Sequence, residues 1–202
     1  MPKFGGGQAR VLTRDEFEEL LGLIAGTAHA KRDILMLRLS YNLGLRAIEI
    51  SRLKLRHVLN PDETLASEIT IDKCKRGKPR TLYLEHRGLR QAVLDYIEER
   101  KKFCEKERID FTLDAPLILS QWNGAFNNRG IQQRFRTLYR IAKYFRCSSH
   151  SGRRTFANVL FDQGAEIKAI QRILGHVDAS TTIIYLDTNA DKMRSAMSKM
   201  NF

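Results

Sequence analysis

Apolar residues recur at helical spacing along most of the chain. Near the N-terminus, a threonine and a glutamate three residues later, Thr13 and Glu16, give the pattern of a capping box. The pattern predicts a helix start there, because an apolar residue follows at every third or fourth position. The positions of this first apolar face are Phe17, Leu20, Leu21 and Ile24.

Further helices are predicted by the same periodicity. One covers residues 31–43 and has Gly44 as its stop signal, and a short one begins near Arg46. A longer one covers residues 88–108. From residue 151 onward the pattern predicts several short helices, with breaks at Gly164, Gly175 and Asp187. Between these regions an apolar stripe at helical spacing predicts a core-facing surface made of Ile131, Phe135, Leu138, Ala142 and Phe145.

Residues 56–84 follow a different pattern. The segments SEITIDKC and PRTLYL alternate apolar and polar residues on either side of KRGK, which predicts a β-hairpin. The predicted fold class is therefore mainly α with a small antiparallel β-sheet, an α+β domain. We expect residues 1–10 to be a flexible basic tail and residues 11–202 to form a single domain.

Charge adds a functional indication. The 202 residues are 43% hydrophobic, which suits a globular protein, and they carry a formal net charge of +12. No acidic residue occurs from Ala115 to Phe161, and a second basic cluster lies in the hairpin turn. Such one-signed stretches favour nucleic-acid binding. The residues expected to contact DNA are Lys73, Arg76, Lys78, Arg80, Arg129, Arg134, Arg136, Arg140 and Arg154.

Several location signals are missing from the sequence. No apolar run approaches the roughly 20 residues of a membrane helix, and the N-terminus has no apolar signal region. The three cysteines, an odd number without metal-type spacing, are expected to be reduced thiols. We therefore expect a cytoplasmic protein that does not associate with membranes.

A set of polar residues stands where neither a core nor a plain surface requires them. Arg46 follows a Gly-Leu pair, His150 and Arg153 are three residues apart at a helix start, and His176 follows Leu174-Gly175. The segments GLRAIEISRL, KRGKPR, HSGRRTFA and LGH, with Tyr185 nine residues after the histidine, closely resemble the catalytic motifs of the tyrosine recombinases, the phage integrase family. The resemblance extends from residue 11 to about residue 200.

The resemblance implies a mechanism and a set of catalytic residues. A tyrosine hydroxyl attacks a DNA phosphodiester and forms a 3′-phosphotyrosyl bond, whose energy is kept for rejoining, so that neither ATP nor a metal is needed as cofactor. The sequence has no P-loop and no carboxylate cluster. Two arginines would hold the phosphate, one histidine would donate to it, another would shuttle the tyrosine proton, and a hairpin lysine would protonate the leaving oxygen. In this chain these positions are Arg46, Arg153, His176, His150 and Lys75, with Tyr185 as the nucleophile.

Alternatives remain for several of these residues. Lys73 and Lys78 compete with Lys75 for the acid role, and Lys75 is preferred because it lies five residues before Arg80, as in the hairpin of the family. His150 and His176 have structural readings as a helix cap and a buried core histidine. We expect Arg46 to pair in part with Glu49, three residues on. As a whole, the chain could instead be a helix-turn-helix DNA-binding regulator, or a strand-passing enzyme like the type IB topoisomerases.

The sequence also departs from the family pattern. Arg154 stands where many members have a second histidine, and Ser151-Gly152 replaces the usual leucine-containing pair. Most members carry an N-terminal core-binding domain, and here we expect none. The resemblance implies site-specific integration, excision or inversion of DNA. The implied partners are double-stranded DNA, further copies of the chain in a tetramer that joins two sites, and accessory DNA-bending proteins. A stripe of Met193, Met197 and Met200 after Tyr185 is expected to dock into a neighbouring copy.

Overall fold

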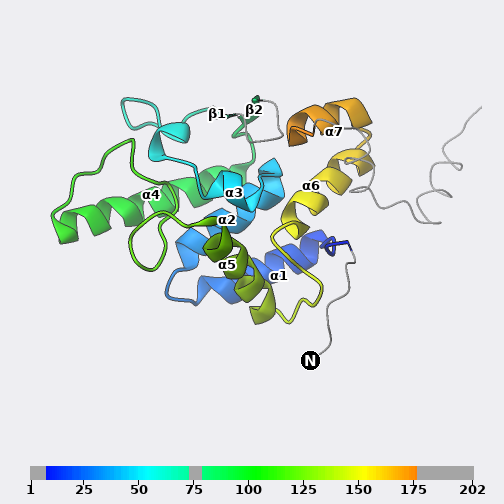
Figure 1. Ribbon diagram of the computed structural model, residues 1–202, viewed down its shortest axis with the longest axis horizontal. Coiled ribbons are helices and arrows are strands. Elements are labelled where there is room, and N and C mark those ends of the chain that lie inside the picture. Colours follow the sequence, from blue (N-terminus) through cyan, green and yellow to red (C-terminus); the bar gives the residue numbers. More distant parts are fainter. Residues whose placement is uncertain (1–7, 73–78, 177–202) are drawn as a thin grey trace, which may run out of the picture.

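The computed structural model describes residues 8–72 and 79–176. These residues form mostly helices and one small antiparallel sheet, as predicted (Figure 1). The elements are α1 (Arg14–Ala25), α2 (Ala30–Leu43), α3 (Ala47–Ile50), the 3₁₀ helix η1 (Leu55–His57), β1 (Glu68–Ile71), β2 (Arg80–Tyr83), α4 (Arg87–Glu107), α5 (Asn128–Ile141), α6 (Ser151–Asp162) and α7 (Ile167–Leu174).

Local sequence signals set the ends of the first two helices. The Thr13 side chain accepts a hydrogen bond from the Glu16 N–H, and the Glu16 side chain accepts one from the Thr13 N–H, which completes the predicted capping box. Gly44 ends α2 in the left-handed conformation with φ of 62°. A β-carbon at Gly44 would also lie 2.5 Å from Cδ1 of Phe156 in α6, so glycine allows the two helices to approach.

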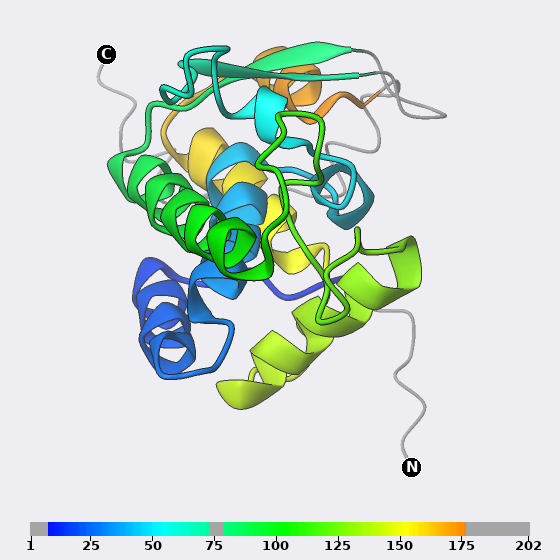
Figure 2. The same cartoon turned by 90° about the vertical axis from the view of Figure 1, so that its left-hand side faces the viewer.

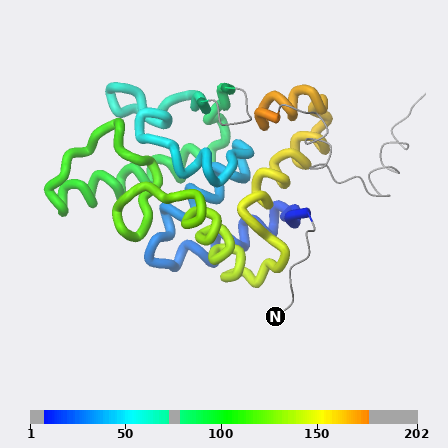
Figure 3. The backbone as a smooth tube through the Cα atoms, viewed as in Figure 1, coloured from blue at the N-terminus to red at the C-terminus, as the bar shows by residue number. Residues whose placement is uncertain are grey.

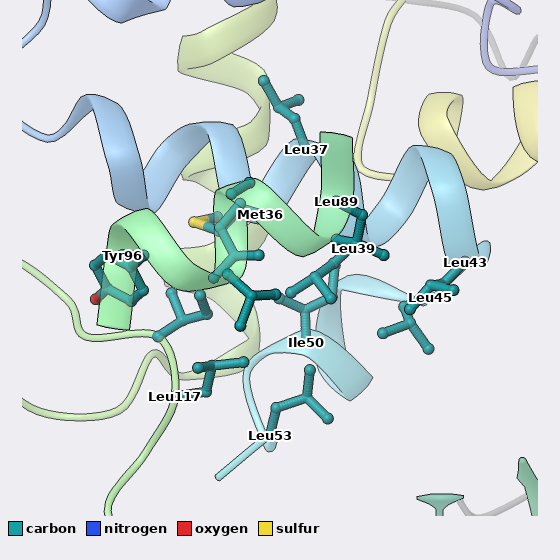
Figure 4. Packing of buried hydrophobic residues seen from close by; sticks show 14 of the residues in the cluster. Met36, Leu37, Leu39, Leu43, Leu45, Ile50, Leu53, Leu89, Tyr96 and Leu117 are labelled. Carbon is teal, nitrogen blue, oxygen red and sulfur yellow. The ribbon is translucent and has the colours of Figure 1, made fainter. Parts of the chain in front are cut away.

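The hydrophobic core is centred on α2. This helix packs against α1, α4 and α6, and α3 follows it directly (Figures 1 and 2). Figure 4 shows Met36 and Leu39 of α2 facing Leu89 of α4, with Ile50 of α3 and Leu117 close by. Since α2 is buried along so much of its length, the loop that leaves it at Gly44 is held firmly, and this loop carries Arg46.

The predicted hairpin is confirmed as a two-stranded antiparallel sheet. Ile69 pairs with Leu82 and Ile71 with Arg80, and the exposed and buried positions alternate along β1. The buried side of the sheet packs into the main core through Ile69, Ile71 and Leu82. Figure 2 shows the strands at one end of the molecule and α5 toward the other. The connecting residues, 73–78, lie outside the described part of the chain.

One part of the predicted core stripe is wrong. Ile131, Phe135 and Leu138 are buried as expected, but α5 ends at Ile141, and the Phe145 side chain is 71% exposed. The helical spacing is lost because Lys143 takes a positive φ of 55° before Phe145 and Arg146 takes one of 65° after it, so the chain leaves the helical path on both sides of Phe145. Periodicity alone could not reveal this, since neither residue is a glycine.

The first described residues run along the start of α6 (Figure 3). The Arg10 N–H donates to the Arg146 carbonyl at 3.1 Å, and the Leu12 N–H donates to the Thr155 hydroxyl at 3.0 Å. In the stretch expected to be a tail, residues 8–10 are therefore hydrogen-bonded to the rest of the protein.

Candidate active site

The first candidate residue, Arg46, precedes α3 and faces a buried acid. Glu49, in the first turn of α3, has a side chain only 1% exposed. It accepts hydrogen bonds from the Arg46 backbone N–H at 2.8 Å and from Arg46 Nη1 at 2.9 Å. The predicted pairing of the two residues is confirmed. The Arg46 side chain keeps 27% of its surface exposed, so the acid holds the guanidinium in place without covering it.

Glu49 also accepts two hydrogen bonds from Arg80, the first residue of β2. Nη1 and Nη2 of Arg80 donate to the two carboxylate oxygens at 3.0 and 2.8 Å. Burial by itself raises the pKa of Glu49, but the hydrogen bonds and charge of Arg80 outweigh it, helped by the Arg46 N–H and the charge of Arg153, and the pKa is lowered below its ordinary 4.5. The carboxylate is therefore ionised at neutral pH.

Arg153 lies in the first turn of α6, and its side chain is fully buried. Its Nη1 and Nη2 donate to the carbonyls of Gly44 and Leu174, each at 2.6 Å. The Leu174 carbonyl lies 3.5 Å from Nη1 of Arg46 as well. One backbone oxygen at the end of α7 is thus shared by both candidate arginines, which brings α3, α6 and α7 to one point.

The two candidate histidines lie beside these arginines. His150 is exposed and occupies the N-cap position of α6. Its ring makes no capping hydrogen bond to that helix, so the alternative role of His150 as a helix cap is wrong. Desolvation, followed by the charges of Arg153 and Arg46, lowers the pKa of His150 below 6.5. His176 is buried directly after Gly175, the left-handed stop of α7. Desolvation, then the charges of Arg153, Arg46 and Arg80, lowers the pKa of His176 to about 3.

A groove opens next to His176 between β2 and α7. It has a volume of about 720 Å³ and is lined by Arg80 and Thr81 from β2 and by Lys168 and Arg172 from α7. Among the residues that the structure describes, the lining includes basic side chains and no acidic one. The groove therefore continues the positive character of the arginine pair along the surface.

The arginines expected to contact DNA are placed in two ways. Arg129, Arg136 and Arg140 are exposed, and their spacing puts them on the face of α5 opposite the buried Ile131, Phe135 and Leu138. Arg134 of the same helix instead pairs with Asp33 of α2, whose side chain is fully buried. The exposed arginines and Arg134 belong to the same helix. Only the exposed face of α5, which carries Arg129, Arg136 and Arg140, is therefore available to a ligand.

Arg80 and Arg154 are directed into the protein. Arg80 binds Glu49 as described, and Arg154 is buried and donates to the Ala9 carbonyl and the Gln8 side chain. Arg154 thus fastens the N-terminal segment to α6. Sequence patterns indicate neither arrangement, because both join residues far apart along the chain.

The remaining predicted site residues lie outside the described part of the chain: Lys73, Lys75, Arg76, Lys78 and Tyr185.

Within residues 8–72 and 79–176, no helix is long and apolar enough to cross a membrane. The same residues contain no cluster of three or more histidine, cysteine or acidic side chains that could hold a metal ion.

The arrangement of helices and hairpin is the fold of tyrosine recombinase catalytic domains. The crystal structure of XerA recombinase superposes with a TM-score of 0.76 and 23% identity, covering 100% of this chain and 68% of that one. The structure of XerH site-specific recombinase bound to its palindromic difH substrate gives a TM-score of 0.74 at 20% identity, covering 98% and 55% of the two chains.

The family follows from the sequence match. Residues 10–192 match the phage integrase family, and the chain belongs to it. Tyrosine recombinase XerC of Pelobacter propionicus is 31% identical over 169 residues, 83% of this chain and 51% of the relative. Tyrosine recombinase XerD of Caulobacter vibrioides is 33% identical over 198 residues, 91% of this chain and 59% of the relative. The chain thus spans between half and three fifths of the length of these two relatives.

Proposed function

We propose that this protein is a site-specific DNA recombinase that cleaves and rejoins strands through a covalent bond to Tyr185. The observation that carries the proposal is the meeting of Arg46, Arg153, His150 and His176, from three separate regions of the chain, around the end of α7. Membership of the phage integrase family supports it, as do relatives named tyrosine recombinases.

The arginine pair suits a phosphodiester that gains negative charge during attack. Arg46 is partly exposed and held by Glu49, so its guanidinium is ready to donate to a nonbridging oxygen. Arg153 lies directly behind it as a second fixed charge. Neither guanidinium can lose its proton at physiological pH. Each charge-assisted contact is worth about 1.5–3 kcal/mol, and contacts that tighten in the transition state raise the rate.

The histidines suit two different proton roles. His176, with a pKa of about 3, is neutral at pH 7 and can donate one N–H to a phosphate oxygen without gaining a proton. His150 is exposed at the edge of the site, and its lowered pKa keeps the ring neutral and able to accept the proton of a phenol. The structural reading of His176 as a buried histidine and the functional one are therefore compatible.

In the covalent step, Tyr185 is the nucleophile and Lys75 is the general acid. The phenolic oxygen, once His150 has taken its proton, forms a bond to phosphorus while the bond from phosphorus to the 5′ oxygen breaks. Lys75 gives a proton to that departing oxygen and is left as the neutral amine. Rejoining reverses each transfer. An ordinary tyrosine pKa near 10 would fall beside the positive charges of the site.

The role of Lys75 has two rivals within the same hairpin, and a modified substrate separates them. Lys75→Ala should slow cleavage of ordinary DNA severely, because the leaving alkoxide then receives no proton. A 5′-bridging sulfur needs no proton when it leaves, so it should restore most of the rate to this variant. Rescue of Lys73→Ala or Lys78→Ala instead would move the acid role to that residue.

We infer that the exposed face of α5 binds the DNA. Arg129, Arg136 and Arg140 recur at a spacing of seven and four residues, so they project from one side of the helix. A row of arginines on one helix face suits the phosphates or base edges of a duplex. DNA binding by a protein of this fold has a precedent in XerH recombinase, whose structure contains a bound difH substrate.

The proposed assembly is a tetramer that joins two DNA sites in the cytoplasm, with accessory DNA-bending proteins where the site requires them. The methionines that we expect to link neighbouring copies lie beyond the described residues. Truncation after Asp187 tests their role, with size measurement in the absence and presence of site DNA. The truncated protein should bind one site and fail to form two-site complexes. A truncated protein that assembles normally would eliminate the docking segment.

Covalent capture tests the proposed function. The protein is incubated with nicked duplexes that represent the flanks of its own gene, in excess EDTA and without ATP. The wild type should form an adduct that survives denaturation, and Tyr185→Phe should bind the same DNA and form none. Strict dependence on Mg²⁺ would contradict the mechanism. Relaxation of a supercoiled plasmid irrespective of sequence would assign the protein to a topoisomerase-like activity.

A further inference from the structure

Arg80 joins two parts of the candidate site that the chain keeps far apart. Its side chain is 6% exposed and contacts both carboxylate oxygens of Glu49. Glu49 in turn holds the backbone N–H and the guanidinium of Arg46. Planar guanidinium and carboxylate groups joined at two points have a fixed mutual orientation, which a single contact would not give.

The same guanidinium also lies against the residue before His176. A β-carbon on Gly175 would be 3.0 Å from Nη1 of Arg80 and 3.2 Å from its Cδ, so the backbone of Gly175 packs closely on this side chain. Gly175 has φ of 65°, and this left-handed turn sets the direction in which the chain enters His176. Arg80 therefore contacts Glu49, which holds Arg46, and Gly175, which directly precedes His176.

The position of Arg80 in the sequence adds a third connection. It is the first residue of β2, and it follows the hairpin segment that carries the lysines 73, 75 and 78 by two residues. The ion pair with Glu49 thus attaches the base of the hairpin to the first turn of α3. Every candidate general acid lies within seven residues of this attachment.

We propose that Arg80 is a positioning residue for strand cleavage, acting through Glu49 on Arg46 and through Gly175 on His176. This inference rests on the proposed function. It replaces the expectation that Arg80 contacts DNA, because a phosphate would have to displace the carboxylate of Glu49 to reach its terminal nitrogens. Misplacement of a catalytic group by about 1 Å can cost about a hundredfold in rate.

The test separates binding from chemistry with two variants and a control. Arg80→Gln removes the charge and the two-point contact, whereas Arg80→Lys keeps the charge and loses only the geometry. Arg87→Gln removes a charge from an exposed side chain at the start of α4, which is not part of the candidate site, and serves as the control. For each protein, DNA affinity is measured across a salt series, and the rate of covalent adduct formation is measured in a single turnover with saturating nicked DNA.

We expect Arg80→Gln to bind DNA with nearly the wild-type affinity and salt dependence, and to form the adduct about 10–100-fold more slowly. Arg80→Lys should fold and also be slow, which keeps the test valid if the glutamine variant does not fold. Arg87→Gln should form the adduct at close to the wild-type saturated rate. In a Glu49→Gln background, Arg80→Gln should cost less than in the wild type, since the part of its effect that passes through Glu49 is already lost.

Two results would overturn the proposal. One is Arg80→Lys or Arg80→Gln forming the adduct at the wild-type saturated rate. The other is a loss confined to DNA affinity and salt slope, which would make Arg80 a phosphate contact after all. If the wild type forms no adduct, the proposed function itself fails. The wild-type reaction therefore distinguishes the failure of one claim from the failure of the other.

Discussion

Replacing Glu49 by glutamine perturbs the side chain that joins Arg46 to Arg80 in the candidate site. The carboxylate is almost fully buried and accepts four hydrogen bonds, two from Arg46 and two from Arg80. Arg153 is a further cation, with its Nη1 3.9 Å from the carboxylate. Glutamine has the same shape, so the change leaves no cavity and isolates the loss of the negative charge.

The cost follows from these contacts. One oxygen becomes an amide nitrogen that faces donors, so the hydrogen bonds to that oxygen are lost, and the three guanidiniums no longer have an anion between them. Removing one partner from a buried ion pair costs about 3–5 kcal/mol. The remaining amide oxygen still accepts, which places the expected loss near the lower limit, about 3 kcal/mol. For a protein of this size, that loss lowers Tm by roughly 6–12 °C.

Chemical denaturation at pH 7 measures the loss, and Glu68→Gln is the matched control because Glu68 is exposed on β1. The control should stay within about 0.5 kcal/mol of the wild type. The pKa of Glu49 is lowered when the protein folds, so its stabilisation is present above its ordinary 4.5 and disappears as the pH falls through the lower folded value. Wild type and variant should therefore converge in acid. A loss below about 1 kcal/mol at pH 7 would show that the buried charge of Glu49 contributes little to stability, contrary to this prediction.

Three further predictions concern the backbone, the DNA face and proton transfer. Gly44→Ala should destabilise the protein by about 3 kcal/mol in denaturation, because alanine is strained in the left-handed conformation and its β-carbon would clash with α6. Gly22→Ala, at an open position of α1, should instead stabilise the protein by about 0.5–1 kcal/mol. Equal effects of the two substitutions would contradict this prediction. Arg136→Gln should reduce the slope of log affinity against log salt by about 1, while exposed Lys102→Gln should leave the slope unchanged. His150 must be neutral to accept a proton, and its pKa is lowered below 6.5. The rate of adduct formation should therefore stay constant as the pH falls to 6.5 and decline only below that value. A decline that begins above pH 6.5 would argue against His150 as the base.

Local signals in the sequence account for most of the described elements. The capping box at Thr13 and the glycine stops at Gly44 and Gly175 are read from one or two residues, and the structure has each of them. The hairpin follows from alternation, with Ile69 and Leu82 paired on the buried side. These features could be predicted because each depends on residues close together in the chain.

The contacts that organise the candidate site depend on residues far apart, and local patterns do not reveal them. The link from Arg46 to Glu49 could be predicted because the residues are three apart on a helix start. The link from Arg80 to Glu49 crosses from the hairpin to α3, so the charge of Arg80 taken alone suggests a DNA contact. The expectation for Phe145 fails for a related reason, since non-glycine residues take left-handed angles that no local pattern foretells.

The identity of the residue joined to DNA is the most direct test of the proposed mechanism. The wild-type protein is trapped on nicked DNA, the DNA is digested to a short remnant, and the peptides are sequenced by mass spectrometry. We expect one modified residue, Tyr185, with the remnant attached through its 3′ phosphate. Attachment to another tyrosine, to a serine or through a 5′ phosphate would contradict the proposed mechanism.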